Sequence, residues 1–225
     1  MKERLVSFAG FLHRKSAKMK TLLINGSPNV EGCTYTALQE VSQTLENEGV
    51  TTELFQLGKK PVSGCIACMK CRETGRCVIS DKVNEFLEKA KEADGFVFGS
   101  PVHFAAAGGA ITSFMDRAFF APDRTVFYLK PAAAVVSARR GGNSTTFDQL
   151  NKYFTICQMP VISSTYWNMV HGWTPADVRQ DLEGLQTMRI LGRNMAWFLK
   201  CKEAGANVGV PFPEQEEPIV TNFVR

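Results

Sequence analysis

The 225-residue sequence has no long hydrophobic run, little excess of charge and no GxGxxG pattern, and each absence excludes a class of protein. The longest apolar stretches, 5–12 and 132–136, are far shorter than the roughly 18 residues that a membrane helix needs, so no membrane span is expected. The formal net charge is only +4, and no basic stripe alternates with aromatic residues. Nucleic acid is therefore not an expected partner, and the usual dinucleotide fingerprint is missing.

The N-terminus and the cysteines bear on the cellular compartment. Basic residues follow the short apolar segment of residues 1–19 where a signal peptide would have its cleavage site, so we expect an N-terminal arm instead. The cysteines number seven, an odd count, and four of them lie between Cys65 and Cys77. This usage indicates a reducing cytoplasm, in which a cysteine cluster is more typical of a metal or redox site than of disulfides.

Short apolar runs alternate five times with segments of helical periodicity. Continuous apolar runs are typical of buried parallel strands, and the predicted strands are 21–24, 51–57, 95–99, 132–137 and 161–164. Strand–helix alternation of this kind predicts a three-layer α/β sandwich around a parallel sheet. One domain is expected over 20–210, with a cysteine-rich insert at 58–80 and an irregular tail at 211–225.

Two helix starts carry clear capping signals. Asp81 is a suitable N-cap for a helix that begins after the cysteine-rich insert. Thr174-Pro175-Ala176-Asp177 combines an N-cap hydroxyl, a proline at the first helical position and an acid three residues after the cap. From there we expect one long helix that ends before Gly205.

Three loops after predicted strands are suited to a ligand, because open parallel sheets bind ligands beyond the carboxyl ends of their strands. The first, 26–34, has glycines and small polar residues that leave N–H groups free around an anion at a helix start. It has no lysine, so it suits a terminal monophosphate rather than a nucleoside triphosphate. An ordinary tight turn is the alternative.

The second and third loops suit a flat ring. Residues 100–104 combine a rigid proline with an aromatic side chain. Residues 137–145 place two arginines beside two glycines, and glycine permits close approach to a ligand. A solvated basic turn is the alternative for this third loop, and His103 alone is more typical of packing or surface than of catalysis.

These loops resemble the FMN-contacting segments of the NAD(P)H-dependent FMN reductase branch of the flavodoxin superfamily. The matching stretches, in chain order, are NGSPNVEGCTYTAL, GSPVHFAAAGGAITSFMDR and SARRGGNSTTFDQL. The resemblance covers residues 20–200. It implies a flavodoxin-like sheet with strand order 2-1-3-4-5, FMN as cofactor, NAD(P)H as a candidate co-substrate and a homodimer or homotetramer.

The resemblance also implies which residues contact FMN. The phosphate would lie at Ser27, Asn29, Gly32, Cys33 and Thr34. The isoalloxazine ring would lie at Pro101, Val102, His103, Phe104, Ser137, Ala138, Arg139, Arg140, Gly141, Gly142 and Thr145. Arg139 would stabilise negative charge on the reduced ring. Cys33 departs from the family, which often has asparagine or serine there, and a thiol is a weaker donor. No catalytic residue is predicted, because the flavin carries the chemistry.

The clustered cysteines form the pattern C-x2-C-x2-C-x5-C, at Cys65, Cys68, Cys71 and Cys77. Thiolates at steps of three with a fourth close by can surround one compact cluster, and bacterial ferredoxins open with a similar run. Structural zinc sites usually have a longer spacer between two C-x2-C pairs. Spacing and position resemble the iron–sulfur flavoproteins, a subgroup of this family, which implies a [4Fe–4S] cluster on these cysteines. Zinc and no metal are the alternatives.

The expected function is that of an FMN-dependent oxidoreductase that passes electrons between a [4Fe–4S] cluster and FMN across a subunit boundary. A ferredoxin-like donor or a small-molecule acceptor would be its partner. Without a cluster, NAD(P)H would reduce FMN, and FMN would reduce a quinone or similar acceptor. An electron carrier or redox sensor without turnover and a structural domain with a zinc knuckle are the remaining candidates. The aromatic segment 119–128 would lie in the core, over the flavin or against another subunit.

Overall fold

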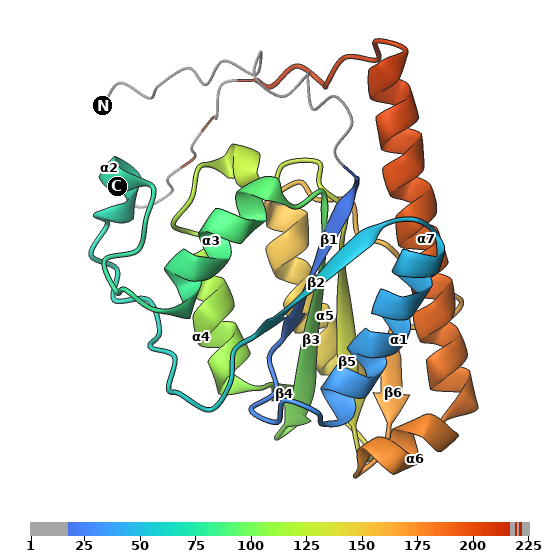
Figure 1. The fold of residues 1–225 in the computed structure, drawn as a ribbon. Coiled ribbons are helices and arrows are strands. Elements are labelled where there is room, and N and C mark those ends of the chain that lie inside the picture. Colours follow the sequence, from blue (N-terminus) through green and yellow to red (C-terminus); the bar gives the residue numbers. More distant parts are fainter. Residues whose placement is uncertain (1–17, 217–218, 220, 222–225) are drawn as a thin grey trace.

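The structure, a computed structural model, describes residues 18–216, 219 and 221, and a parallel sheet organises them (Figure 1). The parallel strands are β1 (Lys20–Asn25), β2 (Thr51–Gln56), β3 (Gly95–His103), β5 (Ala132–Ala138) and β6 (Met169–His171). Their order is β2-β1-β3-β5-β6, and the short β4 (Ala106–Ala107) pairs antiparallel with the end of β3. The predicted α/β class and the 2-1-3-4-5 order of the parallel strands are confirmed, with β4 as an addition.

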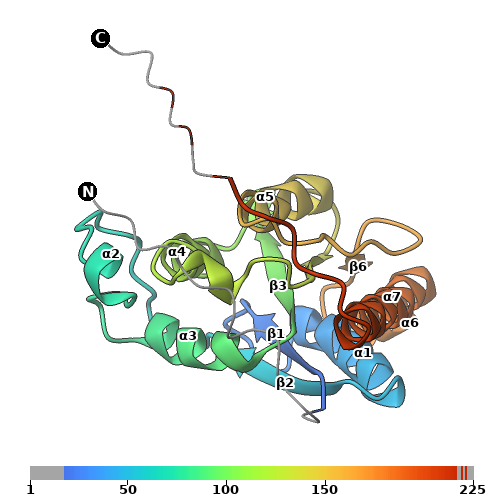
Figure 2. The same cartoon turned by 90° about the horizontal axis from the view of Figure 1, so that it is seen from above.

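Helices cover both faces of the sheet (Figure 2). One face carries α3 (Lys82–Glu92), α4 (Gly109–Ala118) and α5 (Asn143–Ile156). The other carries α1 (Cys33–Asn47), α6 (Pro175–Gln180) and α7 (Leu182–Asn207). Because side chains alternate along a strand, Phe96 and Phe98 of β3 enter the first layer and Val97 enters the second. The short α2 (Cys71–Thr74) and η2 (Arg124–Val126) lie in connecting loops.

Phenylalanine rings fill the first layer. Phe86 of α3 is fully buried, and its ring centroid lies within 6.3 Å of the centroids of Phe55, Phe96, Phe98, Phe114 and Phe127. Three of these pairs are edge-on, an arrangement that suits the ring quadrupoles. Phe119 stacks on Phe127 at 4.5 Å. Phe127 is buried in the core and Phe119 packs against it, which is the first of the three places expected for the segment 119–128, whereas Phe120 lines the cysteine pocket.

The expected helix starts are present. Asp81 accepts a hydrogen bond from the Val83 N–H at 3.1 Å, and Thr174 forms a reciprocal capping box with Asp177. The predicted single C-terminal helix is wrong in two respects, and the first is that Asp181 divides it into α6 and α7. Its carboxylate accepts from the Gly184 N–H at the start of α7 and from the His171 N–H in β6. The helix also continues through Gly205 to Asn207.

The predicted position of the fifth strand is wrong. Val161 makes only an isolated bridge with Ala132, and the strand proper is β6, which pairs with the end of β5. The apolar run at 161–162 is too short to continue, and the exposed Tyr166 and Trp167 lie in the excursion that follows. The displaced strand still occupies the predicted edge of the sheet.

The predicted arm at 1–19 lies outside the described residues except for Lys18 and Met19, and 211–216 form neither helix nor strand. Within the described part of the chain, no helix is both long and apolar enough to cross a membrane.

Replacement of Phe86 by alanine should lower the free energy of unfolding by about 3–5 kcal/mol, because it leaves a cavity among five rings. Ile156→Ala is the control: this side chain is 82% exposed, and its loss should change the free energy by about 0.5 kcal/mol or less. Urea unfolding followed by circular dichroism measures both. Equal losses in the two variants would contradict the aromatic layer as the main source of stability.

Candidate functional site

The loop between β1 and α1 is held from its buried base. The Asn25 amide, at the end of β1, donates to Gln56 Oε1 at 2.7 Å, and its Oδ1 accepts from the Ser27 N–H at 3.1 Å. Gln56 in turn donates to the Ser27 carbonyl at 2.7 Å. Ser27 Oγ accepts from the Asn29 N–H at 3.1 Å. Side chains from two strand ends therefore fix the path of this loop.

The start of α1 is open to an anion. Its N-cap is Gly32, no side chain among the described residues caps it, and its first turn contains no acid. The partial positive charge of the helix start is therefore not balanced by a carboxylate in its own first turn. This arrangement fits a phosphate, as predicted for the first loop.

The Cys33 side chain faces the backbone of Gly172, which follows β6. Its thiol lies 3.7 Å from the Gly172 carbonyl, and burial raises its pKa. A protonated thiol that donates to Gly172 leaves only the backbone N–H of Cys33 for a ligand. This contact gives a physical basis for a cysteine at position 33, where the family often has asparagine or serine.

The second loop is a tight hairpin between β3 and β4. Its two central residues, Phe104 and Ala105, have φ angles of 50° and 59°, a left-handed conformation that is uncommon outside glycine. Each such residue costs about 1–3 kcal/mol, and conformations of this kind gather at ligand sites. The Phe104 side chain is fully exposed at the tip, beyond the strand that carries Pro101, Val102 and His103.

The third loop joins the first two. Thr34 Oγ1 in α1 lies 2.7 Å from Ser137 Oγ at the end of β5. Gly142 has a φ of 93°, and a Cβ atom there would lie 2.6 Å from Ala105 Cα. All three predicted loops therefore meet at the carboxyl edge of the sheet, at the bottom of Figure 1.

Two buried polar side chains at this edge have no hydrogen-bond partner among the described residues. Asn143 and Thr146, in the first turn of α5, are buried, and the Asn143 Nδ2 and Thr146 Oγ1 have no partner among the described residues. Arg139 and Arg140 are exposed beside them, as are Gly141 and Thr145, and the Arg139 guanidinium lies 5.9 Å from the Trp173 ring. Uncapped helix starts, unpartnered buried donors and glycine contacts fit a phosphate-bearing ring cofactor such as FMN.

The four clustered cysteines line a separate pocket near the end of α4. Cys65 and Cys68 are exposed, and Cys71 and Cys77 are half-buried. The rest of the lining is mainly apolar, and the pocket is bounded by Cys65, Ile66, Cys68, Met69, Cys71, Cys77, Val78, Ile79, Arg117, Phe120 and Ala121. The sequence prediction that these cysteines lie together is therefore supported by their position.

The thiols surround the pocket without converging on one point. No group of three or more histidine, cysteine or acidic side chains among the described residues is arranged to hold a metal ion. Burial raises the pKa of Cys71, and the neighbouring Cys68 and Cys77 raise it further against the effect of Arg72. Ala67 and Met69, between the cysteines, have left-handed φ angles of 51° and 60°. Four thiols around an apolar pocket fit a compact multi-atom cluster.

Some residues around the candidate sites have no clear sequence signal. Asn25 and Gln56 could have been found only as polar residues at the ends of strands, and Trp173 only as an aromatic before a helix cap. Arg117 has a stronger signal, because it shares the apolar face of α4 with Phe114 and Ala118 at helical spacing.

The fold is that of a flavodoxin-like α/β protein, and sequence comparison makes the assignment specific. Residues 19–174 match the family of NADPH-dependent FMN reductases, and the chain belongs to this family. It is 38% identical over 191 residues to an iron–sulfur flavoprotein of Methanocaldococcus jannaschii, covering 81% of this chain and 98% of that one. An iron–sulfur flavoprotein of Archaeoglobus fulgidus is 30% identical over 193 residues, covering 80% and 97%.

Solved structures agree in fold. An NAD(P)H:quinone oxidoreductase from Methanothermobacter marburgensis superposes with a TM-score of 0.59 at 17% identity, over 80% of this chain and 96% of that one. With the family established, the protein is a flavin-dependent oxidoreductase, and FMN is the cofactor that the family supports.

Gly142→Ala should weaken FMN binding and destabilise the fold by about 1 kcal/mol or more, because a side chain is strained at a φ of 93° and collides with Ala105. Gly49→Ala is the matched control: its φ of 84° imposes a similar strain, a Cβ there meets nothing within 4 Å, and it follows the end of α1 that is remote from the flavin loops, so it should keep its FMN affinity. Fluorescence titration with FMN and urea unfolding measure the two effects. Equal behaviour of the two variants would contradict the contact between the second and third loops.

Proposed function

We propose that this protein passes electrons between FMN, bound on the three loops at the carboxyl edge of the sheet, and a [4Fe–4S] cluster held by Cys65, Cys68, Cys71 and Cys77. The observation that carries the proposal is the presence of all four cysteine side chains around one pocket. The names of the relatives from Methanocaldococcus jannaschii and Archaeoglobus fulgidus, both iron–sulfur flavoproteins, support it.

The spacing of the cysteines favours a cluster over zinc. Structural zinc sites usually have a longer spacer between two C-x2-C pairs, whereas Cys65, Cys68 and Cys71 follow one another at steps of three, as in the opening run of bacterial ferredoxins. The surrounding apolar side chains, Ile66, Met69, Val78 and Phe120, suit a cluster that is shielded from water. Hydrogen bonds to sulfur and solvent exposure then set its potential.

The chain's own residues would bind and orient the flavin. The start of α1, with Ser27, Asn29, Gly32 and the N–H groups of Cys33 and Thr34, would hold the phosphate. Pro101 to Phe104 and Ser137 to Thr145 would hold the ring, with Arg139 near developing negative charge. FMN, when bound, accepts electrons singly or as a hydride, so no acid–base residue is required.

The two sites lie at opposite ends of α4. This helix begins next to the β3–β4 hairpin and ends at the cysteine pocket, and its 10 residues span about 15 Å. Figure 1 shows α2 far from the edge where β3 and β4 end. Transfer between two chains of a homodimer or homotetramer would shorten this path. A ferredoxin-like protein or a small molecule would be the external partner, in a reducing cytoplasm that keeps the thiols free.

A second candidate is an NAD(P)H-dependent reductase of quinones or similar acceptors that holds no cluster. The description of the matched family as NADPH-dependent favours NADPH as the donor in that case. The two candidates differ in iron content and in the electron donor, so one preparation separates them.

Protein purified without oxygen should show flavin absorption, a broad shoulder near ~400 nm and about four irons and four sulfides per chain. Cys68→Ser should lose the iron and keep the flavin, because Cys68 lies in the pocket and far from the flavin loops. Cys201→Ser, at another exposed cysteine on α7, is the control and should keep both. Flavin without iron in wild-type protein would reject the cluster and favour the second candidate.

Arg139→Ala should lower the reduction potential of bound FMN, because it removes positive charge near the reduced ring. We expect a shift of roughly 5–20 mV, since an exposed charge contributes about 0.2–1 kcal/mol and about 1.4 kcal/mol corresponds to 30 mV for a two-electron couple. Arg193→Ala, an exposed arginine on α7, controls for net charge. Spectroelectrochemical titration measures both, and an unchanged potential in Arg139→Ala would remove the proposed role.

A further inference from the structure

Arg117 is the largest fully buried side chain in the described part of the protein, with 1% of its surface exposed. It lies near the end of α4, on the face that packs into the core with Phe114 and Ala118. A charged group is expensive to bury unless partners satisfy all of its hydrogen-bonding groups. The position therefore requires an explanation beyond packing.

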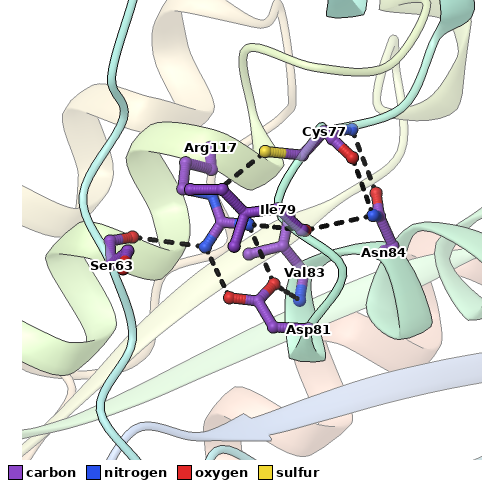
Figure 3. A network of polar contacts seen from close by, with 7 residues as sticks. All are labelled: Ser63, Cys77, Ile79, Asp81, Val83, Asn84 and Arg117. Carbon is purple, nitrogen blue, oxygen red and sulfur yellow. Dashed lines mark hydrogen bonds and ion pairs between the residues drawn. The ribbon is translucent and has the colours of Figure 1, made fainter.

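Every N–H of the guanidinium has a partner (Figure 3). Two of its donors form a bidentate pair with the Asp81 carboxylate, at 2.6 and 2.9 Å. Two others reach backbone carbonyls, of Ser63 at 3.2 Å and of Ile79 at 3.0 Å. The fifth, Nε–H, is donated to Cys77 Sγ at 3.2 Å. A guanidinium has five N–H donors, so none is left over.

These partners flank the cysteine loop on both sides. Ser63 precedes Cys65, whereas Cys77, Ile79 and Asp81 follow the rest of the loop. Arg117 thus connects the entrance and the exit of the loop to one helix. A lysine, with a single ammonium, lacks the planar fork that this arrangement uses.

Cys77 is held more firmly than the other cysteines of the pocket. The Asn84 side chain accepts from the Cys77 N–H at 3.0 Å and donates to its carbonyl at 2.9 Å, while Arg117 holds the sulfur. Burial acts to lower the pKa of Arg117, but the hydrogen bonds with Asp81 and Cys77 outweigh it, so the pKa is raised and the group stays charged.

We propose that Arg117 is a positioning residue for the cysteine site: it closes the loop around the pocket and keeps its Nε–H on the Cys77 sulfur when the site is loaded. This inference rests on the proposed function, because it concerns the cluster that the four cysteines would hold. A donor on a ligating sulfur stabilises the added negative charge of the reduced cluster. Loss of such a supporting partner typically costs about 10–100-fold in metal affinity.

The test uses full-length protein with FMN bound, reconstituted without oxygen from ferrous iron and sulfide. Arg117→Met keeps the apolar stem and removes all five donors, and Arg117→Lys keeps the charge without the fork. Arg76→Gln is the matched control, because it removes the same charge from an exposed residue next to Cys77 that is not bonded to its sulfur. Iron and FMN per chain, iron loss to a chelator and the cluster potential are measured for each.

We expect Arg117→Met to bind FMN as the wild type does, to hold iron about 10–100-fold more weakly and to have a more negative cluster potential. Arg117→Lys should also hold iron more weakly than the wild type, with a smaller shift of the cluster potential. It is the variant to measure if Arg117→Met does not fold. Arg76→Gln should stay close to the wild type.

Two results would overturn the inference without affecting the proposed function. In the first, both Arg117 variants of an iron-loaded protein keep the iron retention and the cluster potential of the wild type. In the second, Arg76→Gln changes iron retention and cluster potential as much as the Arg117 variants do. Wild-type protein that takes up FMN but no iron would reject the cluster itself, and the inference would fail with it. The wild-type iron content therefore separates the two failures.

Discussion

The parallel pairing of β3 between β1 and β5 is the constraint on which both sites depend. Its register places Asn25 beside Gly99 and Pro101 beside Ser137, so the three loops leave the sheet at nearly the same level. Gly99 also permits α1 to approach, because a Cβ atom there would lie 2.8 Å from Thr34 Cγ2 and Leu38 Cδ1. Only with α1 that close does the Thr34 hydroxyl reach Ser137.

From this central strand the chain leads directly to the second site. β3 ends in the hairpin with β4, and α4 begins two residues after β4 and carries Arg117 to the cysteine pocket. Asp81 is the counterpart on α3: one carboxylate caps that helix through the Val83 N–H and binds the Arg117 guanidinium. The positions of two core helices therefore determine the position of Cys77. The cysteine loop, which has few regular elements of its own, takes its shape from this frame.

The sequence predicted what depends on local composition and period. Buried apolar runs, capping residues such as Thr174 and the grouping of the cysteines all follow from near neighbours in the chain. What failed depends on distant contacts. The fifth strand is β6 rather than 161–164, because it pairs with the end of β5. The last helix is divided at Asp181, whose carboxylate accepts a hydrogen bond from the distant His171 N–H. Asn25, Gln56 and Arg117 became visible as site residues only when their partners from distant elements were in place.

Strained backbone conformations, with left-handed φ angles at residues other than glycine, gather at the two candidate sites. Six residues other than glycine have left-handed φ angles in the described part of the chain, and four of them lie at the two sites: Ala67 and Met69 between the cysteines, and Phe104 and Ala105 in the hairpin. Such conformations persist only where the surrounding structure determines them. The hairpin is fixed by its ladder with β4 and by contact with Gly142, and the cysteine loop by Arg117 and Asn84. Both loops lie at the ends of α4, which packs on the buried aromatic layer through Phe114, so the same core supports the hairpin and the cysteine loop.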